Sequence, residues 1–160
     1  MVLATLPAAA LAVVHLDLGF GASQIGSNLD DLSTWSALNF SAADATPANL
    51  VAIAEVNREE WMFKTDSIEV WIDAGLSGFA FQRLEGVFIE MGCAAAFSPA
   101  LLGESLIWLT RNLQGEAQVV KARGYQPGRV STHAIEREIA SYPRIDDAIG
   151  FTYQQEGHLF

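Results

Sequence analysis

From residue 50 onward, short apolar stretches alternate with polar residues at a period of two, a pattern typical of β-strands. It predicts strands at Leu50–Val56, Trp61–Lys64 and Ile68–Asp73. Polar clusters at 57–60 and 65–67 separate these strands. The connections are too short for the crossover helix that parallel strands need, so we expect an antiparallel meander. In the third strand, alternate residues are expected on opposite faces of the sheet, with Ile68, Val70 and Ile72 on one and Glu69, Trp71 and Asp73 on the other.

The same pattern continues to the end of the chain. Five further strands are predicted, at Phe79–Arg83, Ser105–Arg111, Ala117–Arg123, Ile149–Gln154 and His158–Phe160. The last two flank the polar turn 155–157 and form a predicted hairpin. Several short strands at regular spacing are typical of a β-sandwich, a barrel or propeller blades, and periodicity alone leaves these three open.

One short helix is expected near residues 132–141. Ser131 or Thr132 can cap its N-terminus, and Pro143 ends it. Apolar residues recur there at helical spacing, at Ile135, Ile139 and Tyr142. The predicted fold class is therefore mainly β, with antiparallel meanders and one helix.

The chain opens with an apolar run at residues 2–14. A membrane span needs about 20 such residues, and Pro7 and Asp17 limit this run. A secretory signal carries a basic leading region, but no lysine or arginine precedes Arg58. We therefore expect a buried strand or a dispensable tail, and no membrane partner.

Composition narrows the class of protein. A length of 160 residues fits one domain, and 51% apolar with 18% charged residues excludes intrinsic disorder. Cys93 is the sole cysteine, which excludes a disulfide framework. The formal net charge of -10, of which the first 57 residues contribute -5, disfavours a protein that grips nucleic acid.

The glycine-rich segment 19–28 resembles nucleotide-binding loops without satisfying their requirements. Gln24 stands where a dinucleotide fingerprint needs its third glycine, and Ser27 and Asn28 follow Gly26 where a phosphate loop needs lysine and then serine or threonine. The sequence therefore predicts no nucleotide cofactor.

Candidate reactive side chains each have a simpler structural explanation. Cys93 could be a nucleophile if His133 lay nearby, but the small residues around it favour a buried, inert thiol. His133 and Glu136 could share a metal, yet a stable site needs three or four ligands, so a capping or surface role for His133 is favoured.

Acidic and aromatic residues offer two further alternatives. Adjacent acidic pairs could serve a glycosidase but are more simply solvated turn residues, at Asp30–Asp31, Glu59–Glu60 and Asp146–Asp147. Four tryptophans could form a stacking platform for sugars or bases but are more simply sheet core, at Trp35, Trp61, Trp71 and Trp108. We predict no catalytic, cofactor-binding or metal-binding residues, and no enzyme.

Six segments, taken in order, resemble one family. They are Trp35–Val51, Ile68–Trp71, Gly86–Ala95, Ala122–Glu136, Asp147–Ala148 and Tyr153–His158. The match is strongest over Ala122–Glu136, and the order and spacing together resemble the packaged-DNA stabilisation proteins of short-tailed phages, also called tail accessory or tail hub proteins. The resemblance covers residues 28–160 and leaves 1–27 as an unmatched apolar segment.

The resemblance implies a non-enzymatic virion protein built as a β-propeller. Such a protein sits below the portal in the tail, is assembled in the bacterial cytoplasm, and helps close the DNA exit channel. Its implied partners are the portal and neighbouring tail subunits, with DNA as a polymer that passes without specific contact. Family members are longer, so we expect residues 28–160 to hold about two blades and part of a third, as an incomplete product or a prophage remnant.

Two hypotheses follow from this resemblance. The acidic surface could be a non-stick lining for passing DNA, because each basic residue against a phosphate adds affinity; ordinary solubility is the alternative. Unpaired strand edges of a partial propeller should make the chain self-associate. A glycan-directed enzyme or binding module on a β-propeller or β-sandwich scaffold is the alternative function.

Overall fold

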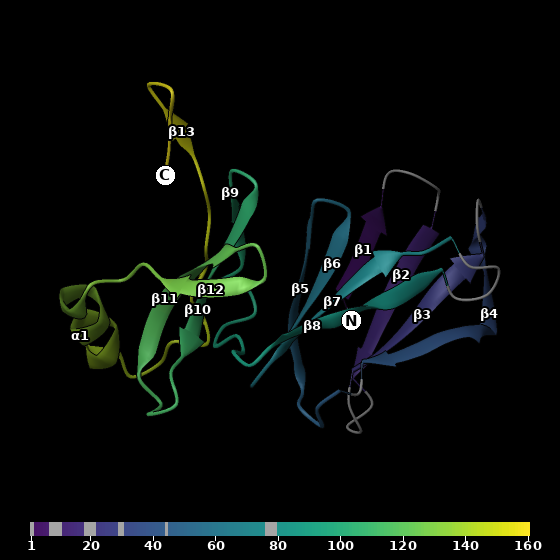
Figure 1. Ribbon diagram of the computed structural model, residues 1–160, viewed down its shortest axis with the longest axis horizontal. Coiled ribbons are helices and arrows are strands. Elements are labelled where there is room, and N and C mark those ends of the chain that lie inside the picture. Colours follow the sequence, from purple (N-terminus) through teal and green to yellow (C-terminus); the bar gives the residue numbers. More distant parts are fainter. Residues whose placement is uncertain (1, 7–10, 18–21, 29–30, 44, 76–79) are drawn as a thin grey trace.

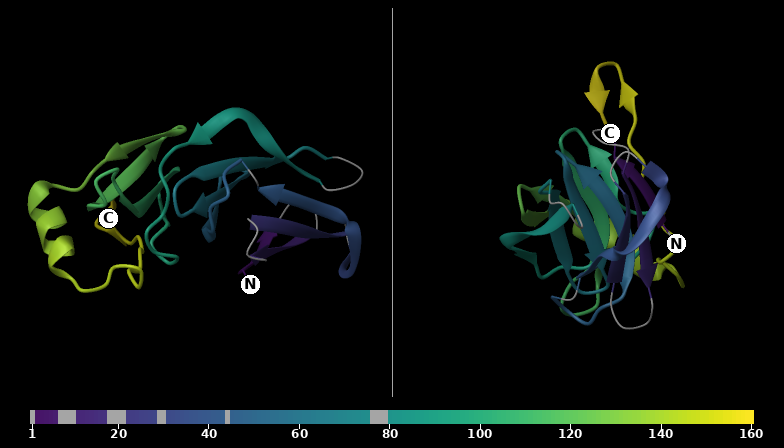
Figure 2. Two further views of the ribbon diagram at one scale, coloured as in Figure 1. Left: turned by 90° about the horizontal axis from the view of Figure 1, so that it is seen from below. Right: turned by 90° about the vertical axis from the view of Figure 1, so that its right-hand side faces the viewer.

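The computed structural model describes residues 2–6, 11–17, 22–28, 31–43, 45–75 and 80–160. Its described strands form three four-stranded antiparallel sheets, each built from strands consecutive in sequence, and a small hairpin. The three sheets follow one another along the longest axis of the molecule (Figures 1 and 2). We call them the N-terminal, central and C-terminal sheets.

Each sheet is a simple meander. The N-terminal sheet contains β1 (Val2–Leu6), β2 (Leu11–Asp17), β3 (Ala22–Asn28) and β4 (Asp31–Ala43) in that order. The central sheet contains β5 (Leu50–Val56), β6 (Glu59–Lys64), β7 (Ile68–Asp73) and β8 (Phe81–Ile89). The C-terminal sheet contains β9 (Ala100–Leu102), β10 (Ser105–Arg111), β11 (Ala117–Arg123) and β12 (Gln126–Arg129).

The helix α1 (His133–Ser141) follows the C-terminal sheet, and β13 (Gln154–Gln155) and β14 (His158–Leu159) form a hairpin that projects from the body (Figure 1). Thr132 is the N-cap residue, and its hydroxyl accepts a hydrogen bond from the Ile135 amide at 3.4 Å. Tyr142, immediately before Pro143, is extended. The predicted helix is confirmed within one residue at its start.

Tight hairpins fix the registers. Asn57 and Arg58 join β5 to β6 with φ of 55° and 67°. Positive φ at both central residues gives a turn whose twist matches that of the flanking strands. The same geometry recurs between β13 and β14, at Glu156 and Gly157 with φ of 50° and 81°.

The core between the central and C-terminal sheets is aromatic. Trp61 and Phe63 on β6 face Trp108 on β10, and the Phe63 and Trp108 rings meet edge to face with centroids 5.3 Å apart. Aliphatic residues from both sheets complete it, at Ile68, Val70, Leu106 and Val120. Burial of this apolar area holds the two sheets face to face.

The opposite face of the central sheet is buried as well. Met62, Trp71 and Phe81 pack there with Ala43 of the N-terminal sheet. The same face holds a fully buried ion pair between Lys64 and Glu69. Backbone groups of the connection from β4 to β5 complete its hydrogen bonds: the Lys64 ammonium donates to the Thr46 carbonyl at 3.1 Å, and the Ala45 amide donates to Glu69 at 3.2 Å.

Most strand predictions are confirmed. β5, β7, β10 and β11 have the predicted bounds, and β6 begins two residues earlier than predicted. The described residues of the apolar run 2–14 lie in two strands, β1 and β2. β1, β2 and β3 share a sheet with β4. The predicted boundary between an N-terminal segment, residues 1–27, and a partial propeller domain, residues 28–160, stays a prediction.

Two predictions need correction, and a third is confirmed. The strand predicted at Phe79–Arg83 begins at Phe81, within the described residues, and extends to Ile89 through a register irregularity. The two faces predicted for β7 are confirmed, because Ile68 and Val70 pack toward the C-terminal sheet and Trp71 packs on the opposite face beside Ala43 of the N-terminal sheet. The final hairpin has only short strands, because Ile149 bridges Phe97 instead of pairing within the hairpin.

Candidate functional site

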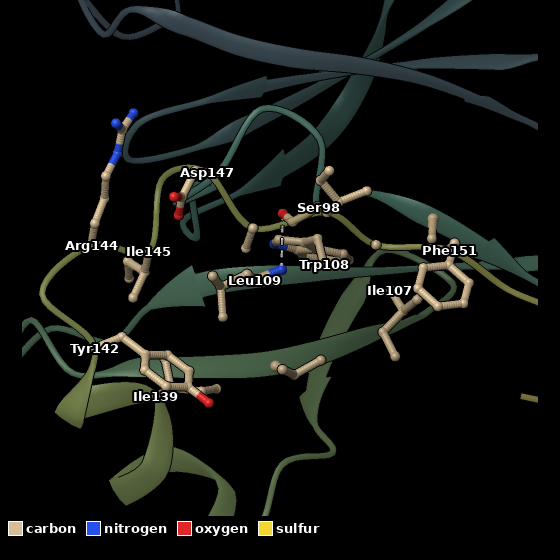
Figure 3. Close-up of a pocket in the computed structure, with 15 residues that line it drawn as sticks. Ser98, Ile107, Trp108, Leu109, Ile139, Tyr142, Arg144, Ile145, Asp147 and Phe151 are labelled. Carbon is tan, nitrogen blue, oxygen red and sulfur yellow. Dashed lines mark hydrogen bonds between the residues drawn. The ribbon is translucent and has the colours of Figure 1, made fainter.

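An apolar groove of about 470 Å³ lies on the face of the C-terminal sheet that points away from the central sheet (Figure 3). Its walls come from β10, β11, α1 and the segment that follows the helix. The apolar side chains that line it include Ile107, Leu109, Val119, Ile139, Ile145 and Phe151. The groove leaves no signal in the sequence, because its walls are far apart along the chain.

Two close contacts of residues 97 and 98 with the backbone build the wall of the groove opposite the helix. The Ser98 hydroxyl accepts a hydrogen bond from the Leu109 amide at 3.2 Å, which ties the connection between β8 and β9 to β10 (Figure 3). The Gly150 amide donates to the Phe97 carbonyl at 2.8 Å. A Cβ atom on Gly150 would lie 2.2 Å from the Ser98 carbonyl oxygen, so this approach requires glycine.

The polar groups at the groove do not form a reactive pair. Arg144 donates to Asp146 at 2.5 Å, and this hydrogen bond raises the pKa of Arg144 and lowers the pKa of Asp146. Both side chains are exposed. Asp147 lines the groove, but the adjacent carboxylate of Asp146 forms an ion pair with Arg144. The arrangement suits apolar packing better than acid–base chemistry.

Glu136 anchors the helix to the sheet. Its carboxylate accepts hydrogen bonds from the Ser131 hydroxyl and from Arg129, each at 2.6 Å, and the Ser131 contact contributes most to its lowered pKa. The Ser131 hydroxyl also accepts from the Val119 amide at 3.0 Å. His133 is 85% exposed beside Arg129, as the predicted surface role requires. No group of three or more metal-ligating side chains occurs among the described residues.

Cys93 is buried at the junction between the central and C-terminal sheets. Its sulfur lies 3.1 Å from the Ala95 carbonyl oxygen and 3.4 Å from the Ser98 hydroxyl. Burial raises the pKa of the thiol and so disfavours the reactive thiolate. The prediction of a buried thiol is confirmed.

Glu59 links the central sheet to the β11–β12 turn. Its carboxylate accepts hydrogen bonds from the Trp61 indole at 3.2 Å and from the Tyr125 hydroxyl, and the Tyr125 contact raises the pKa of that tyrosine. The neighbouring Glu60 is 3% exposed, so the two acids are not a solvated turn pair as predicted. Successive strand residues point to opposite faces, which separates the two carboxylates.

The other candidates are accounted for as follows. Trp61, Trp71 and Trp108 are at most 5% exposed, which fits sheet core and not a stacking platform. Trp35 lies in β4. Of the first acidic pair, Asp31 begins β4 and Asp30 lies outside the described residues.

A family model described as bacteriophage P22 Gp10, beta-propeller, matches residues 19–160. The chain belongs to this family. The family is a phage DNA stabilisation protein family, so the chain is a structural phage protein. The predicted fold class, antiparallel sheets of a β-propeller with one short helix, is confirmed.

The family match extends beyond the resemblance stated from the sequence. It begins at residue 19, whereas the resemblance stated from the sequence covers residues 28–160. A search of curated proteins finds no match to the chain. Among the described residues, no helix has both the length and the apolar character needed to cross a membrane.

Proposed function

We propose that this protein is a component of the phage tail hub that assembles below the portal, helps close the DNA exit channel and keeps the packaged genome in the head. Membership of the P22 Gp10 β-propeller family is the observation that carries the proposal. The stacked sheets supply a rigid body for such a role, because the core between the central and C-terminal sheets fixes their packing.

We further propose that the protein acts by assembly and not by catalysis. Among the described residues, the candidate nucleophile Cys93 is buried with a raised pKa, and Glu136 is occupied by Ser131 and Arg129. Large apolar side chains are instead exposed around the groove and hairpin, at Phe97, Ile149, Phe151, Leu159 and Phe160. Exposed apolar patches typically mark contacts with other proteins.

The net charge of -10 supports a companion proposal, a surface that DNA passes without adhering. Counterion release by lysine and arginine supplies much of nonspecific DNA affinity, and this chain has nine such residues against nineteen acids. Binding of duplex DNA can be measured by fluorescence anisotropy at about 25–150 mM salt, the range in which phosphate contacts vary most. No binding is expected, and saturable binding at the lowest salt would end the lining proposal.

The experiment for the main proposal is deletion of the gene from the phage or prophage that carries it. Heads should fill with DNA and then lose it, so nuclease-protected genomes per particle should fall. Expression of the wild-type chain, or of Gly128→Ala, whose added Cβ atom would meet no atom closer than 3.6 Å, should restore protection. Particles that keep their genomes without the protein would contradict the proposal.

A further inference from the structure

A small pocket of about 220 Å³ opens where turns of the central and C-terminal sheets meet. The β5–β6, β9–β10 and β11–β12 turns surround it. The Asn57 amide nitrogen lies 3.5 Å from the Glu104 carbonyl oxygen, and the Tyr125 hydroxyl donates a hydrogen bond to the Glu59 carboxylate. These contacts hold the three turns together. The pocket shares no described lining residue with the apolar groove.

The base of the pocket is apolar and aromatic. Val56, Leu106 and Ala122 line it, together with the rings of Trp61 and Tyr125. These two rings stack with their centroids 6.0 Å apart and their planes at 29°. Trp61 is buried, whereas Tyr125 is 39% exposed. Aromatic rings attract a cation placed over or beside them, so a positively charged ligand gains from this base.

The rim of the pocket offers mainly hydrogen-bond acceptors. The carboxylates of Glu59 and Glu104 both line it. The Trp61 indole at 3.2 Å and the Tyr125 hydroxyl each donate to Glu59 and hold its carboxylate in place. An ionised carboxylate has about four acceptor positions, so Glu59 can accept further donors. Glu104 is exposed in its turn. The rim therefore suits a cation that carries several N–H donors.

The charges around the pocket do not cancel those of its two carboxylates. Among its described lining residues, none is lysine or arginine. Four charged neighbours in the strands alternate with lining residues and so point to the other face of their sheet, Glu55, Glu60, Lys121 and Arg123. The fifth, Arg58, is exposed in the β5–β6 turn outside the lining. Counted with the pocket, it still leaves two carboxylates against one base.

The size of the pocket limits what it can hold. Sites for drug-sized ligands usually measure about 300–1,000 Å³, so a pocket of about 220 Å³ suits a single side chain better than an oligosaccharide or a nucleotide. Arginine has a planar group with five donors that pairs with carboxylates and stacks on aromatic rings, whereas lysine is a compact point charge. We propose that this pocket binds an arginine side chain presented by a partner protein.

The choice of a protein as the source of the arginine rests on the proposed role in assembly. Arginine, tyrosine and tryptophan are the residues that most often dominate binding energy at protein interfaces. The pocket lies among turns, where a side chain that projects from a partner can reach it. The test below uses the purified chain without phage particles. The pocket and the genome-retention role can therefore fail separately.

Titration of the purified chain with N-acetyl-arginine amide tests the pocket. Nuclear magnetic resonance can follow the indole N–H of Trp61, which donates to Glu59. The indole of Trp108 donates to the Gly92 carbonyl and serves as the internal reference. The Trp61 signal should shift and saturate with a dissociation constant of about 1–10 mM, while the Trp108 signal stays in place. No shift up to about 50 mM, or equal shifts of both signals, would overturn the inference.

Three related probes define the ligand. N-acetyl-citrulline amide has nearly the same shape without the charge and should bind about tenfold more weakly, because it loses the cation–aromatic attraction and the charge-assisted hydrogen bonds. N-acetyl-lysine amide should also bind more weakly than the arginine probe. Equal binding of the citrulline or the lysine probe would overturn the assignment to arginine. Tighter binding of free arginine than of the blocked probe would overturn the assignment to a protein.

Variants place the probe in the pocket. Glu104→Gln should weaken binding about threefold, as expected for loss of an exposed ion pair. Tyr125→Leu removes the exposed ring and should weaken binding by a similar factor. Glu156→Gln is the matched control, because Glu156 is also an exposed glutamate in a hairpin turn but lies outside the pocket. An unchanged Trp108 signal verifies the fold of each variant. Equal affinity of all three variants would overturn the inference.

Discussion

Replacement of Gly92 by alanine tests the junction between the central and C-terminal sheets. A Cβ atom at this position would lie 2.2 Å from the Thr65 carbonyl oxygen and 2.5 Å from the Asp66 amide nitrogen, whereas ordinary contacts begin at 3.4 Å. Both neighbours are backbone atoms, so the connection after β8 must move away from the turn between β6 and β7. Overpacking of this kind costs about 1–3 kcal/mol.

The same movement breaks two hydrogen bonds. The Cys93 amide donates to the Lys64 carbonyl at 2.9 Å, and the Trp108 indole donates to the Gly92 carbonyl at 3.2 Å. Their loss adds about 2 kcal/mol at about 1 kcal/mol each. We therefore expect Gly92→Ala to lower the free energy of unfolding by about 3–5 kcal/mol.

Urea unfolding followed by tryptophan fluorescence measures this change, because Trp61 and Trp108 are buried at the junction. With a urea slope of about 2 kcal/mol per molar, the midpoint should fall by roughly 2 M. Gly128→Ala is the matched control, because the nearest atom to its Cβ lies 3.6 Å away and its φ is not positive. The reasoning is refuted if the two variants unfold at the same urea concentration.

Three further outcomes are expected. Trp108→Ala removes a side chain that is 1% exposed and should lower the free energy of unfolding by about 3–5 kcal/mol, again measured in urea; a loss below about 1 kcal/mol would contradict its place in the core. Cys93 should resist an aromatic disulfide reagent at pH 8 in the native protein and react in urea, because burial raises the pKa of its thiol; equal rates would contradict that burial. Glu136 has a lowered pKa in the folded state, so its stabilisation is present above the ordinary value of 4.5 and is lost as pH falls through the lowered pKa. Thermal unfolding from about pH 6 to pH 3 should therefore show a smaller acid loss for Glu136→Gln than for the wild type, and parallel curves would contradict the assignment.

The elements that could be predicted are those whose signals are local. β10 and β11 are short apolar stretches on either side of a loop with Gly115, and α1 carries a cap at Thr132 and a stop at Pro143. β12 was missed because Pro127 argues against a strand, although an edge strand tolerates it. β4 was missed because its small and polar residues give little contrast between faces.

The parts that could not be predicted depend on contacts between distant segments. Glu69 in an alternating strand indicates a solvated face, and it is buried because Lys64 and the connection at Ala45 satisfy its carboxylate. The groove exists because Ile149 pairs with Phe97, a contact that periodicity does not encode. The small residues around Cys93 did predict its burial. Small side chains allow a segment to pack closely against neighbouring backbone, and their presence can be read from the local sequence alone.

The central claim is that this structural phage protein is a stack of antiparallel sheets, which we propose lies inside the phage tail. Electron cryomicroscopy of purified particles, at a resolution that separates strands about 4.8 Å apart, tests it most directly. The account predicts density below the portal into which the central and C-terminal sheets fit together, with Trp61, Phe63 and Trp108 between them. Particles whose tail hub contains no density for this chain, or that show these two sheets apart, would contradict it.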